Sequence, residues 1–432
     1  MLAVENNPDQ PVSQLIVSWL LMIPLFFFAC RGILWFQAAG GNSFGPTGFN
    51  TLAAAKSGGE VAVFLTVFLS VLLLLITRLI SVLEICWNNW VFVVLALYAM
   101  ASCAWSQFPT RSLQFGIYIA FNILFAFYLH SRFRPQALMK LFALLGWIVV
   151  LSSIMFAVAL PKYGIDHRIY TAGSWQGVFI YKNTCSVMAT FLLSVAFYMP
   201  VYSLRGKLLR AAYVLLTVFL VLMTRARTGW ILLAVLLAYV VIMKLVGSFK
   251  AGDRMAVVVL LAMVFTVLAV VCALYSREMF VALGKDPTLT GRTEIWKLSV
   301  DSAMKRPLFG YGYRAFWTGT LQGESAHIAL LEKWTVTGAH NGLLETWLDL
   351  GLIGVGMVLI ALAVGVRNGV TCLKHGTTPH AKWYLSIIVM TIVSNIAEMT
   401  LMFPNYLTWI MCVLACVGLA HESKQIRRQA CA

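Results

Sequence analysis

Four basic side chains stand at the ends of apolar stretches, where they could bind an anion. Arg225 and Arg227 flank a single small residue, Arg292 opens a polar segment, and Lys182 begins another apolar stretch. The planar guanidinium pairs with phosphate oxygens and stays charged at a low-dielectric interface. Together these side chains would hold a diphosphate without a metal ion. The simpler alternative for any one of them is an interfacial cation reaching lipid headgroups.

His340 is the residue best suited to proton transfer, and Asn341 beside it is a further predicted substrate contact. A neutral imidazole accepts a proton from a sugar hydroxyl, an effect worth roughly 10²- to 10⁴-fold in rate. A structural histidine is the alternative, and His167 and His327 fit that alternative better. His340 is favoured because it lies between a long polar segment and an apolar one. We expect no metal ion and no cofactor, since no Asp-rich cluster and no metal-like Cys spacing occurs.

The elements that position these residues are predicted to cross a membrane. Hydrophobic residues make up 61% of the chain and charged residues 11%, well below the quarter or so typical of soluble domains. The apolar runs are continuous, which favours helices over the alternating strands of a membrane barrel. The net charge of +16 is explained by basic cytoplasmic loops and does not require nucleic acid.

The fold class expected is therefore all-α, a polytopic membrane protein of about 12 transmembrane helices with a long ordered periplasmic loop. Residues 1–275 hold nine spans, 276–342 the loop, and 343–432 three spans and a cytoplasmic tail. The predicted spans are 15–36, 61–82, 86–105, 113–131, 138–160, 178–203, 208–224, 229–247, 255–275, 343–366, 383–402 and 404–421.

The orientation follows from the basic residues of the short loops. With a cytoplasmic N-terminus, fifteen Lys and Arg fall on the inner side and seven on the outer side, so both termini are predicted to be cytoplasmic. The slightly acidic N-terminal residues argue against a cleavable signal peptide.

The loop is expected to be ordered because its apolar residues recur at helical spacing. Thr293 is the predicted N-cap of a first helix that Pro307 ends, and a second apolar-faced segment covers about 324–335. Residues 307–313, PLFGYGY, are interpreted as a turn with interfacial tyrosines. Glu398 lies in an apolar run and is expected to pair with a buried cation or polar group. Three glycines of the tenth span, Gly351, Gly354 and Gly356, are expected at helix contacts.

As a set, these motifs resemble the O-antigen ligase and polymerase superfamily. The resemblance rests on GRTEIW (291–296), RPLFGYG (306–312), AHNGLL (339–344) and WLDLGLIG (347–354), with GVFIYKN (177–183) and RARTGW (225–230) upstream. The resemblance covers about residues 175–400, and the residues of the motifs are most similar to those of exopolysaccharide polymerases of the ExoQ type. Tyr181 departs from the pattern, which has a histidine before the Lys-Asn pair.

The resemblance implies a GT-C-like, inverting, metal-independent glycosyltransferase at the periplasmic face of the bacterial inner membrane. Its donor would be an undecaprenyl-diphosphate-linked oligosaccharide. His340 would activate the acceptor hydroxyl, and Arg225, Arg227 and Arg292 would bind the leaving diphosphate. A flippase and a chain-length co-polymerase are the partners implied.

Two activities fit the resemblance, and a third class of protein remains as an alternative. A polymerase would use a lipid-linked repeat unit as acceptor, whereas an O-antigen ligase would use lipid A-core. A transporter of lipid-linked sugars would need charges at the midplane of several spans and paired broken helices. The charges here gather at the ends of the spans instead, which favours an enzyme.

Overall fold

A computed structural model describes residues 21, 24–29, 58–168, 171–248, 292–318, 323–332, 336–375 and 378–431. Within these ranges the chain is helical, without a strand and with one isolated bridge between Ile165 and Trp175. The helices are α3 (Gly58–Ile76), α4 (Leu79–Asn88), α5 (Trp90–Ala101), η1 (Ser102–Ala104), α6 (Pro109–Arg132), α7 (Pro135–Ala159), α8 (Pro161–Gly164), α9 (Lys182–Tyr198), α10 (Leu204–Met223), α11 (Arg227–Ser248), α14 (Arg292–Lys305), α15 (Ala326–Glu332), α16 (Gly342–His375), α17 (Pro379–Ala397) and α18 (Leu407–Cys431).

The chain is an all-α, multi-pass membrane protein, as predicted. Five helices of the described part are long and apolar enough to cross a membrane, namely α6, α7, α10, α11 and α16. A bent pair, α3 with α4, would make a sixth. The predicted count of twelve is not tested, because the ninth span, 255–275, and most of the first, 15–36, lie outside the described residues.

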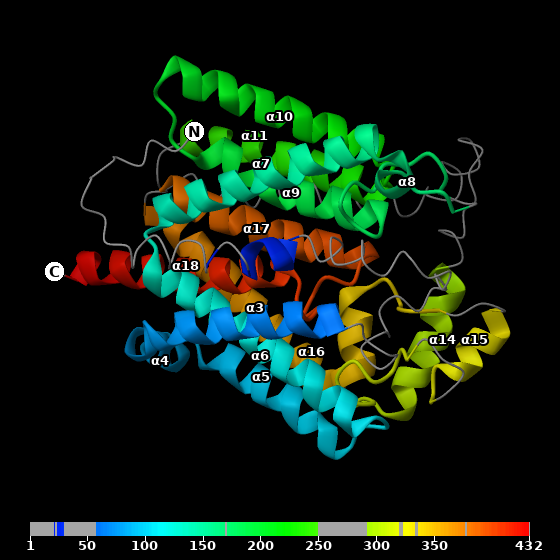
Figure 1. The fold of residues 1–432 in the computed structure, drawn as a ribbon. Coiled ribbons are helices and arrows are strands. Elements are labelled where there is room, and N and C mark those ends of the chain that lie inside the picture. The colour runs from blue at the N-terminus through cyan, green and yellow to red at the C-terminus, as the bar shows by residue number, and fades with distance from the viewer. Residues whose placement is uncertain are drawn as a thin grey trace.

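The helices run side by side, and the predicted inner and outer segments lie at opposite ends of the bundle. In Figure 1 the start of α10 and the end of α18 lie on the left, whereas α8, α14 and α15 lie on the right. This arrangement agrees with the sidedness derived from the basic loops. The compartment that each end faces stays a prediction.

Two helices depart from the predicted spans at breaks in the backbone. The predicted span 61–82 is divided at residues 77–78, where α3 and α4 meet at 89°. The predicted span 343–366 lies within α16 and is kinked near its start. Gly351 has φ 68° and ψ −173° inside α16, so that helix consists of two segments joined at a kink. Its first segment, 342–350, crosses the ends of the other helices and the second continues through the bundle (Figure 1).

Gly351 is required at this kink for two reasons. A positive φ is strained for residues with a Cβ, and a Cβ here would lie 2.0 Å from the carbonyl oxygen of Leu308. The neighbour of Gly354 is Leu350, four residues earlier in α16, and no described residue lies within 4 Å of the Cβ position of Gly356. The expected contacts of these two glycines with other helices therefore stay predictions.

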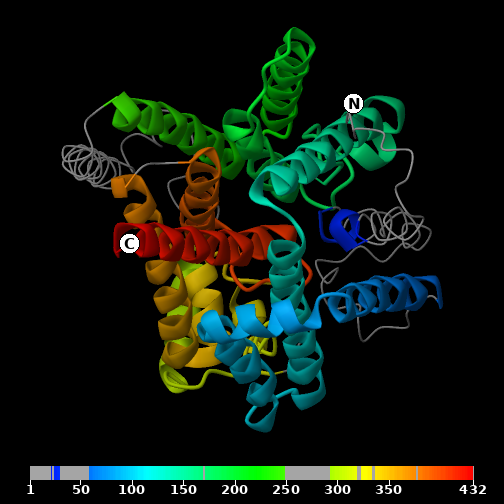
Figure 2. The ribbon, with the colours of Figure 1, turned by 90° about the vertical axis from the view of Figure 1, so that its left-hand side faces the viewer.

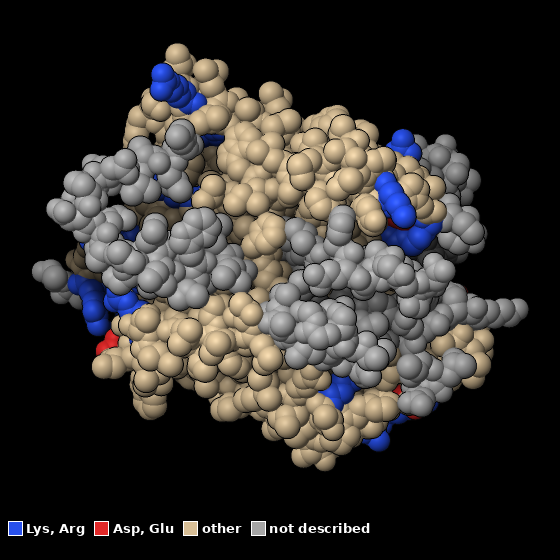
Figure 3. All heavy atoms as spheres, in the orientation of Figure 1, with Lys and Arg blue, Asp and Glu red and all other residues tan. Residues whose placement is uncertain are grey.

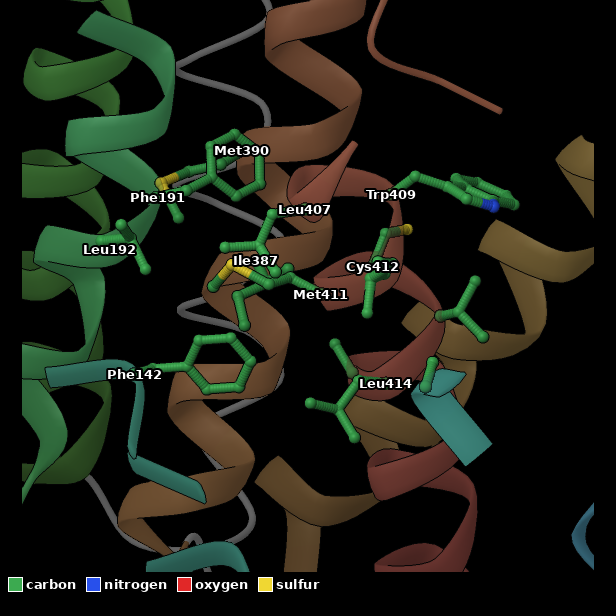
Figure 4. Packing of buried hydrophobic residues seen from close by; sticks show 14 of the residues in the cluster. Phe142, Phe191, Leu192, Ile387, Met390, Leu407, Trp409, Met411, Cys412 and Leu414 are labelled. Carbon is green, nitrogen blue, oxygen red and sulfur yellow. The ribbon is translucent and has the colours of Figure 1, made fainter. Parts of the chain in front are cut away.

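The main hydrophobic core lies between α7, α9, α17 and α18. Phe142, Phe191, Ile387, Met390 and Met411 interdigitate there, each almost completely buried (Figure 4). In the view of Figure 2, α18 is central, with α3–α6 on one side of it and α9–α11 on the other. The core therefore fixes the ends of α9 and α17, from which several site residues project.

A second, smaller core supports the predicted loop. It contains buried residues of α14, α15, the first segment of α16 and the turn after α14: Ile295, Ala303, Tyr311, Phe316, Trp317, Ile328, Val336, Ala339 and Leu348. The expected first helix is confirmed as α14, which ends before Pro307. The N-cap assignment is wrong, because Thr293 is the second residue of the helix. The second expected segment is confirmed as α15.

Candidate active site

Glu398 brings together three motifs that are far apart in the sequence. Its Oε1 accepts hydrogen bonds from Asn183 Nδ2 at 2.7 Å and from Thr228 Oγ1 at 3.1 Å. Arg292 Nη2 lies 3.8 Å from the same oxygen, and Arg292 Nη1 donates to the Ala397 carbonyl at 2.7 Å. The expectation that Glu398 pairs with a cation is confirmed. It lies just beyond the end of α17, at the junction of the motifs, and not inside a span.

The three partners of Glu398 all belong to the first turns of helices. Asn183 is the second residue of α9, Thr228 the second of α11 and Arg292 the first of α14. A helix N-terminus carries roughly half a positive charge and unpaired N–H groups. The starts of three helices thus lie near Glu398, and its carboxylate together with the negative C-terminal end of α17 balances part of their charge.

His340 lies beside this point in a strained backbone conformation. Its φ is 52°, in the left-handed region, and its Nδ1 is buried without a partner among the described residues. Burial, together with the positive charge of Arg292, lowers the pKa of His340 from 6.5 to about 4. The imidazole is therefore neutral at neutral pH, the form that accepts a proton.

The residues on either side of His340 hold its loop in place. Asn341 caps α16, because its Oδ1 accepts from the backbone N–H of Leu343 at 3.1 Å and of Leu344 at 3.0 Å. Its Nδ2 donates to the Ile396 carbonyl at 3.3 Å, next to the carbonyl that binds Arg292. The predicted substrate contact of Asn341 stays a prediction, while its geometry gives it a positioning role.

Ala339, the residue preceding His340, is held by one buried and one partly buried side chain. Its N–H donates to Glu345 Oε1 at 2.6 Å, and its carbonyl accepts from Trp296 Nε1 at 2.7 Å. Glu345 in turn lies 3.8 Å from Arg314 Nη1. These contacts anchor the backbone before His340 to α14 and α16, and so to rigid elements instead of a free loop.

Lys182, Arg225 and Arg227 form a second group of cations near the starts of α9 and α11. Arg225 and Arg227 are exposed, while the residue between them, Ala226, is 1% exposed and anchors the turn. Arg225 has φ 51° and its Nη1 lies against Gly173. Lys182 donates to Ser174 Oγ at 3.3 Å and lies within electrostatic range of both arginines.

An ion pair between a buried carboxylate and a half-exposed arginine lies next to this group. Asp166 is 2% exposed and accepts from Arg168 with both carboxylate oxygens. The Arg168 guanidinium lies 4.7 Å from the centre of the Tyr181 ring, directly before Lys182. Tyr181, the departure from the expected histidine, therefore serves as a stacking platform that fixes the start of α9.

The structure brings most of the predicted site residues together. Arg292, His340 and Asn341 share one cluster around the end of α17, and Lys182, Arg225 and Arg227 share the neighbouring one. The sequence analysis did not assign Glu345, Arg314 and Arg168 to the site. Only their charge in otherwise apolar or loop segments could have indicated them.

The other two histidines considered in the sequence analysis form ordinary structural contacts. His327 bonds to the Glu324 carbonyl and lies 3.5 Å from Ser302 Oγ. His167 Nε2 contacts the Pro161 carbonyl at 3.2 Å. Both fit the structural interpretation.

The interpretation of residues 307–313 as a turn is confirmed, but the tyrosines are not interfacial. Tyr311 is 3% exposed and Tyr313 is 2% exposed. Their hydroxyls donate to the carbonyls of Ser302 and Met402, and these hydrogen bonds offset the cost of removing the hydroxyls from water. The turn instead packs tightly against α16, with the Tyr311 N–H donating to the Leu348 carbonyl at 2.8 Å.

Within the described residues, no group of three or more His, Cys, Asp or Glu side chains is arranged to hold a metal ion. The geometry of the site therefore combines a neutral imidazole, a cationic surface and several helix N-termini in an all-helical membrane protein. That combination is suited to group transfer from a phosphorylated donor.

Comparison with known proteins finds a family model and a relative that are similar to this chain. Residues 212–359 match the family model described as O-antigen ligase. The exopolysaccharide production protein ExoQ of Rhizobium meliloti (strain 1021) is 28% identical over 291 residues, which cover 63% of each chain. The chain thus aligns with less than two thirds of that relative's length.

These two matches confirm the resemblance to the O-antigen ligase and polymerase superfamily, ExoQ-like, that was drawn from the motifs. The family match includes Arg225, Arg227, Arg292 and His340, whereas Lys182 lies before it.

Proposed function

We propose that this protein is a membrane glycosyltransferase that polymerises undecaprenyl-diphosphate-linked oligosaccharide repeat units at the periplasmic face of the inner membrane. The product is an exopolysaccharide or O-antigen, and the reaction inverts the anomeric centre without a metal ion. The proposal is supported by the site and by the similarity to an exopolysaccharide production protein.

The observation that carries the proposal is the neutral His340 beside Arg292 at the convergence of the helix N-termini. In the reaction an acceptor hydroxyl oxygen attacks the anomeric carbon of the donor, and the bond from that carbon to the diphosphate oxygen breaks. His340 takes the hydroxyl proton. The diphosphate leaves with the bonding electrons, and Arg292, Arg225 and Arg227 stabilise the charge that develops on it.

A ligase that transfers the same donor glycan to lipid A-core is the alternative, and the description of the matching family favours it. The donor side of the reaction is common to both activities. Incubating the purified protein with lipid-linked repeat units alone tests the choice. A ladder of multiples supports the polymerase, and a product that forms only when lipid A-core is added supports the ligase. No product with either acceptor contradicts both.

The pH dependence of the reaction should report the environment of His340. Because its pKa is lowered to about 4, the base stays unprotonated as the pH falls, and kcat/KM should be constant from about pH 8 to about pH 5 and fall near pH 4. Bound diphosphate favours the imidazolium, so kcat should begin to fall at a higher pH than kcat/KM. Initial rates over this range check both points. A kcat/KM profile that breaks near 6.5 would contradict the buried, neutral base.

Arg225→Lys tests whether the donor diphosphate is gripped by a guanidinium. Lysine keeps the charge but loses the two parallel N–H groups, so the donor KM should rise roughly tenfold, the equivalent of about 1.4 kcal/mol. The measurement is the donor KM at saturating acceptor. Arg205→Lys, an exposed arginine at the opposite end of α10, is the matched control and should leave KM unchanged. Equal KM values in the two variants would remove Arg225 from the diphosphate site.

A further inference from the structure

An apolar groove lies at the end of α14 remote from His340. Its volume is about 510 Å³, and it is lined by Trp105, Arg306, Pro307, Leu308, Phe309 and Gly310. Leu308 and Phe309 are 53% and 51% exposed. The groove is rigid, because Trp105 Nε1 donates to the Phe309 carbonyl at 3.0 Å and the two rings meet edge to face at 5.6 Å.

Arg306 places one positive charge at this groove. Its Nη1 lies 3.5 Å from the Trp105 carbonyl, and its guanidinium is 5.0 Å from the centre of the Tyr311 ring. The side chain is exposed, and no carboxylate of the described residues forms an ion pair with it. A fixed cation beside exposed apolar walls is complementary to a lipid that carries a phosphate.

The groove and the base are joined by two helical segments that run together. Near the start of α14, Trp296 binds the carbonyl of Ala339, and beyond its end the Pro307 carbonyl accepts from Trp347 Nε1 at 3.1 Å. The 14 residues of α14 span roughly 20 Å at 1.5 Å per residue. Arg306 is therefore about one helix length from Arg292, a separation that an oligosaccharide of a few sugars can bridge.

Donor and acceptor differ in the distance between their reacting atom and their diphosphate, and this difference determines which of them can place a diphosphate at Arg306. The donor breaks the bond between its first sugar and its diphosphate, so the donor diphosphate must lie next to the reacting carbon and His340. In a lipid-linked acceptor, the attacking hydroxyl is on the sugar farthest from the diphosphate. The acceptor diphosphate must therefore lie one repeat unit away from His340.

We propose that the groove is the acceptor subsite, where Arg306 binds the diphosphate of a second lipid-linked repeat unit and the walls receive its first isoprenoid units. The sugars of that acceptor extend along α14 and bring the terminal hydroxyl to His340. This inference rests on the proposed polymerase function. Figure 3 shows Lys and Arg side chains at two separate places on this end of the molecule, one near α8 and one below it near the ends of α5 and α6.

The test compares two acceptors in Arg306→Gln. One acceptor is the diphosphate-linked polyprenyl repeat unit, and the other is the same oligosaccharide with a free reducing end. Arg306→Gln should raise the KM of the lipid-linked acceptor roughly tenfold or more, since it removes a charge-assisted contact. The KM of the free oligosaccharide should be the same in the variant and the wild type. Arg205→Gln, which removes an exposed charge at the start of α10, is the matched control and should leave both KM values unchanged.

A second variant tests the apolar walls. Leu308→Gln should raise the KM of the polyprenyl-linked acceptor, but not that of an acceptor with the same diphosphate and a short alkyl chain. Its side chain is half-exposed, so the substitution leaves the core intact.

The outcomes separate this inference from the proposed function. If the wild type forms no polymer from lipid-linked units, the polymerase proposal fails. If the wild type polymerises and Arg306→Gln matches Arg205→Gln, the acceptor subsite is wrong. An equal rise in KM for the lipid-linked and free acceptors also overturns it, because the arginine would then not contact the diphosphate.

Discussion

Replacing His340 with alanine should lower the rate of product formation by roughly 10²- to 10⁴-fold, the usual contribution of a general base. The variant should still fold and insert, because the neighbouring contacts of Ala339 and Asn341 use backbone and side-chain groups that the substitution leaves unchanged. The rate is measured with saturating donor and acceptor, on protein whose amount and thermal stability match those of the wild type.

The matched control for this variant is His327→Ala. His327 is also a histidine of the segment between α14 and α16, but its ring contacts Glu324 and Ser302 and not the cationic site. We expect near-wild-type rates from it. Near-wild-type product from a stable His340→Ala protein would show that the hydroxyl is activated by another group.

Arg292→Lys should cost roughly 10²-fold in kcat/KM, although the positive charge is kept. The guanidinium reaches two acceptors at once, the Ala397 carbonyl through Nη1 and the Glu398 carboxylate through Nη2. A lysine ammonium cannot occupy both positions, so α14 and its cation would shift relative to His340. A displacement of about 1 Å of this kind is enough for such a loss.

Arg205→Lys makes the same exchange at an exposed arginine at the start of α10 and should leave kcat/KM unchanged. A pH profile separates positioning from a general loss of structure. The Arg292 charge lowers the pKa of His340, so a displaced cation should move the acidic limb of kcat/KM upwards. Wild-type kcat/KM with an unmoved limb would remove Arg292 from the site.

The sequence predicted the chemistry of the site better than its architecture. Arg225, Arg292 and His340 could be selected because each has a residue type and a position that match a simple chemical role. Glu398 was correctly expected to have a partner, since an isolated carboxylate is costly in an apolar run. That it joins the starts of α9, α11 and α14 could not be predicted, because the partners are 215, 170 and 106 residues away along the chain.

The breaks in the helices could not be predicted from hydropathy either. The segment 342–350 is apolar enough to continue the span that follows it, and only the backbone of Gly351 against Leu308 separates the two. The tyrosines of the turn after α14 were misassigned for a related reason. A hydroxyl that finds a carbonyl in the folded protein makes burial favourable, and that partner is invisible in the local sequence.

The convergence of helix starts around Glu398 has a consequence for how the site responds to mutation and to solvent. Part of its attraction for an anion comes from peptide dipoles, which have no proton to lose and no side chain to replace. For the proposed diphosphate donor, we therefore expect that neutralising Arg225, Arg227 and Lys182 together weakens binding without abolishing it. The affinity that remains comes from peptide dipoles, so it should not decrease when the pH is raised and lysine side chains lose their protons.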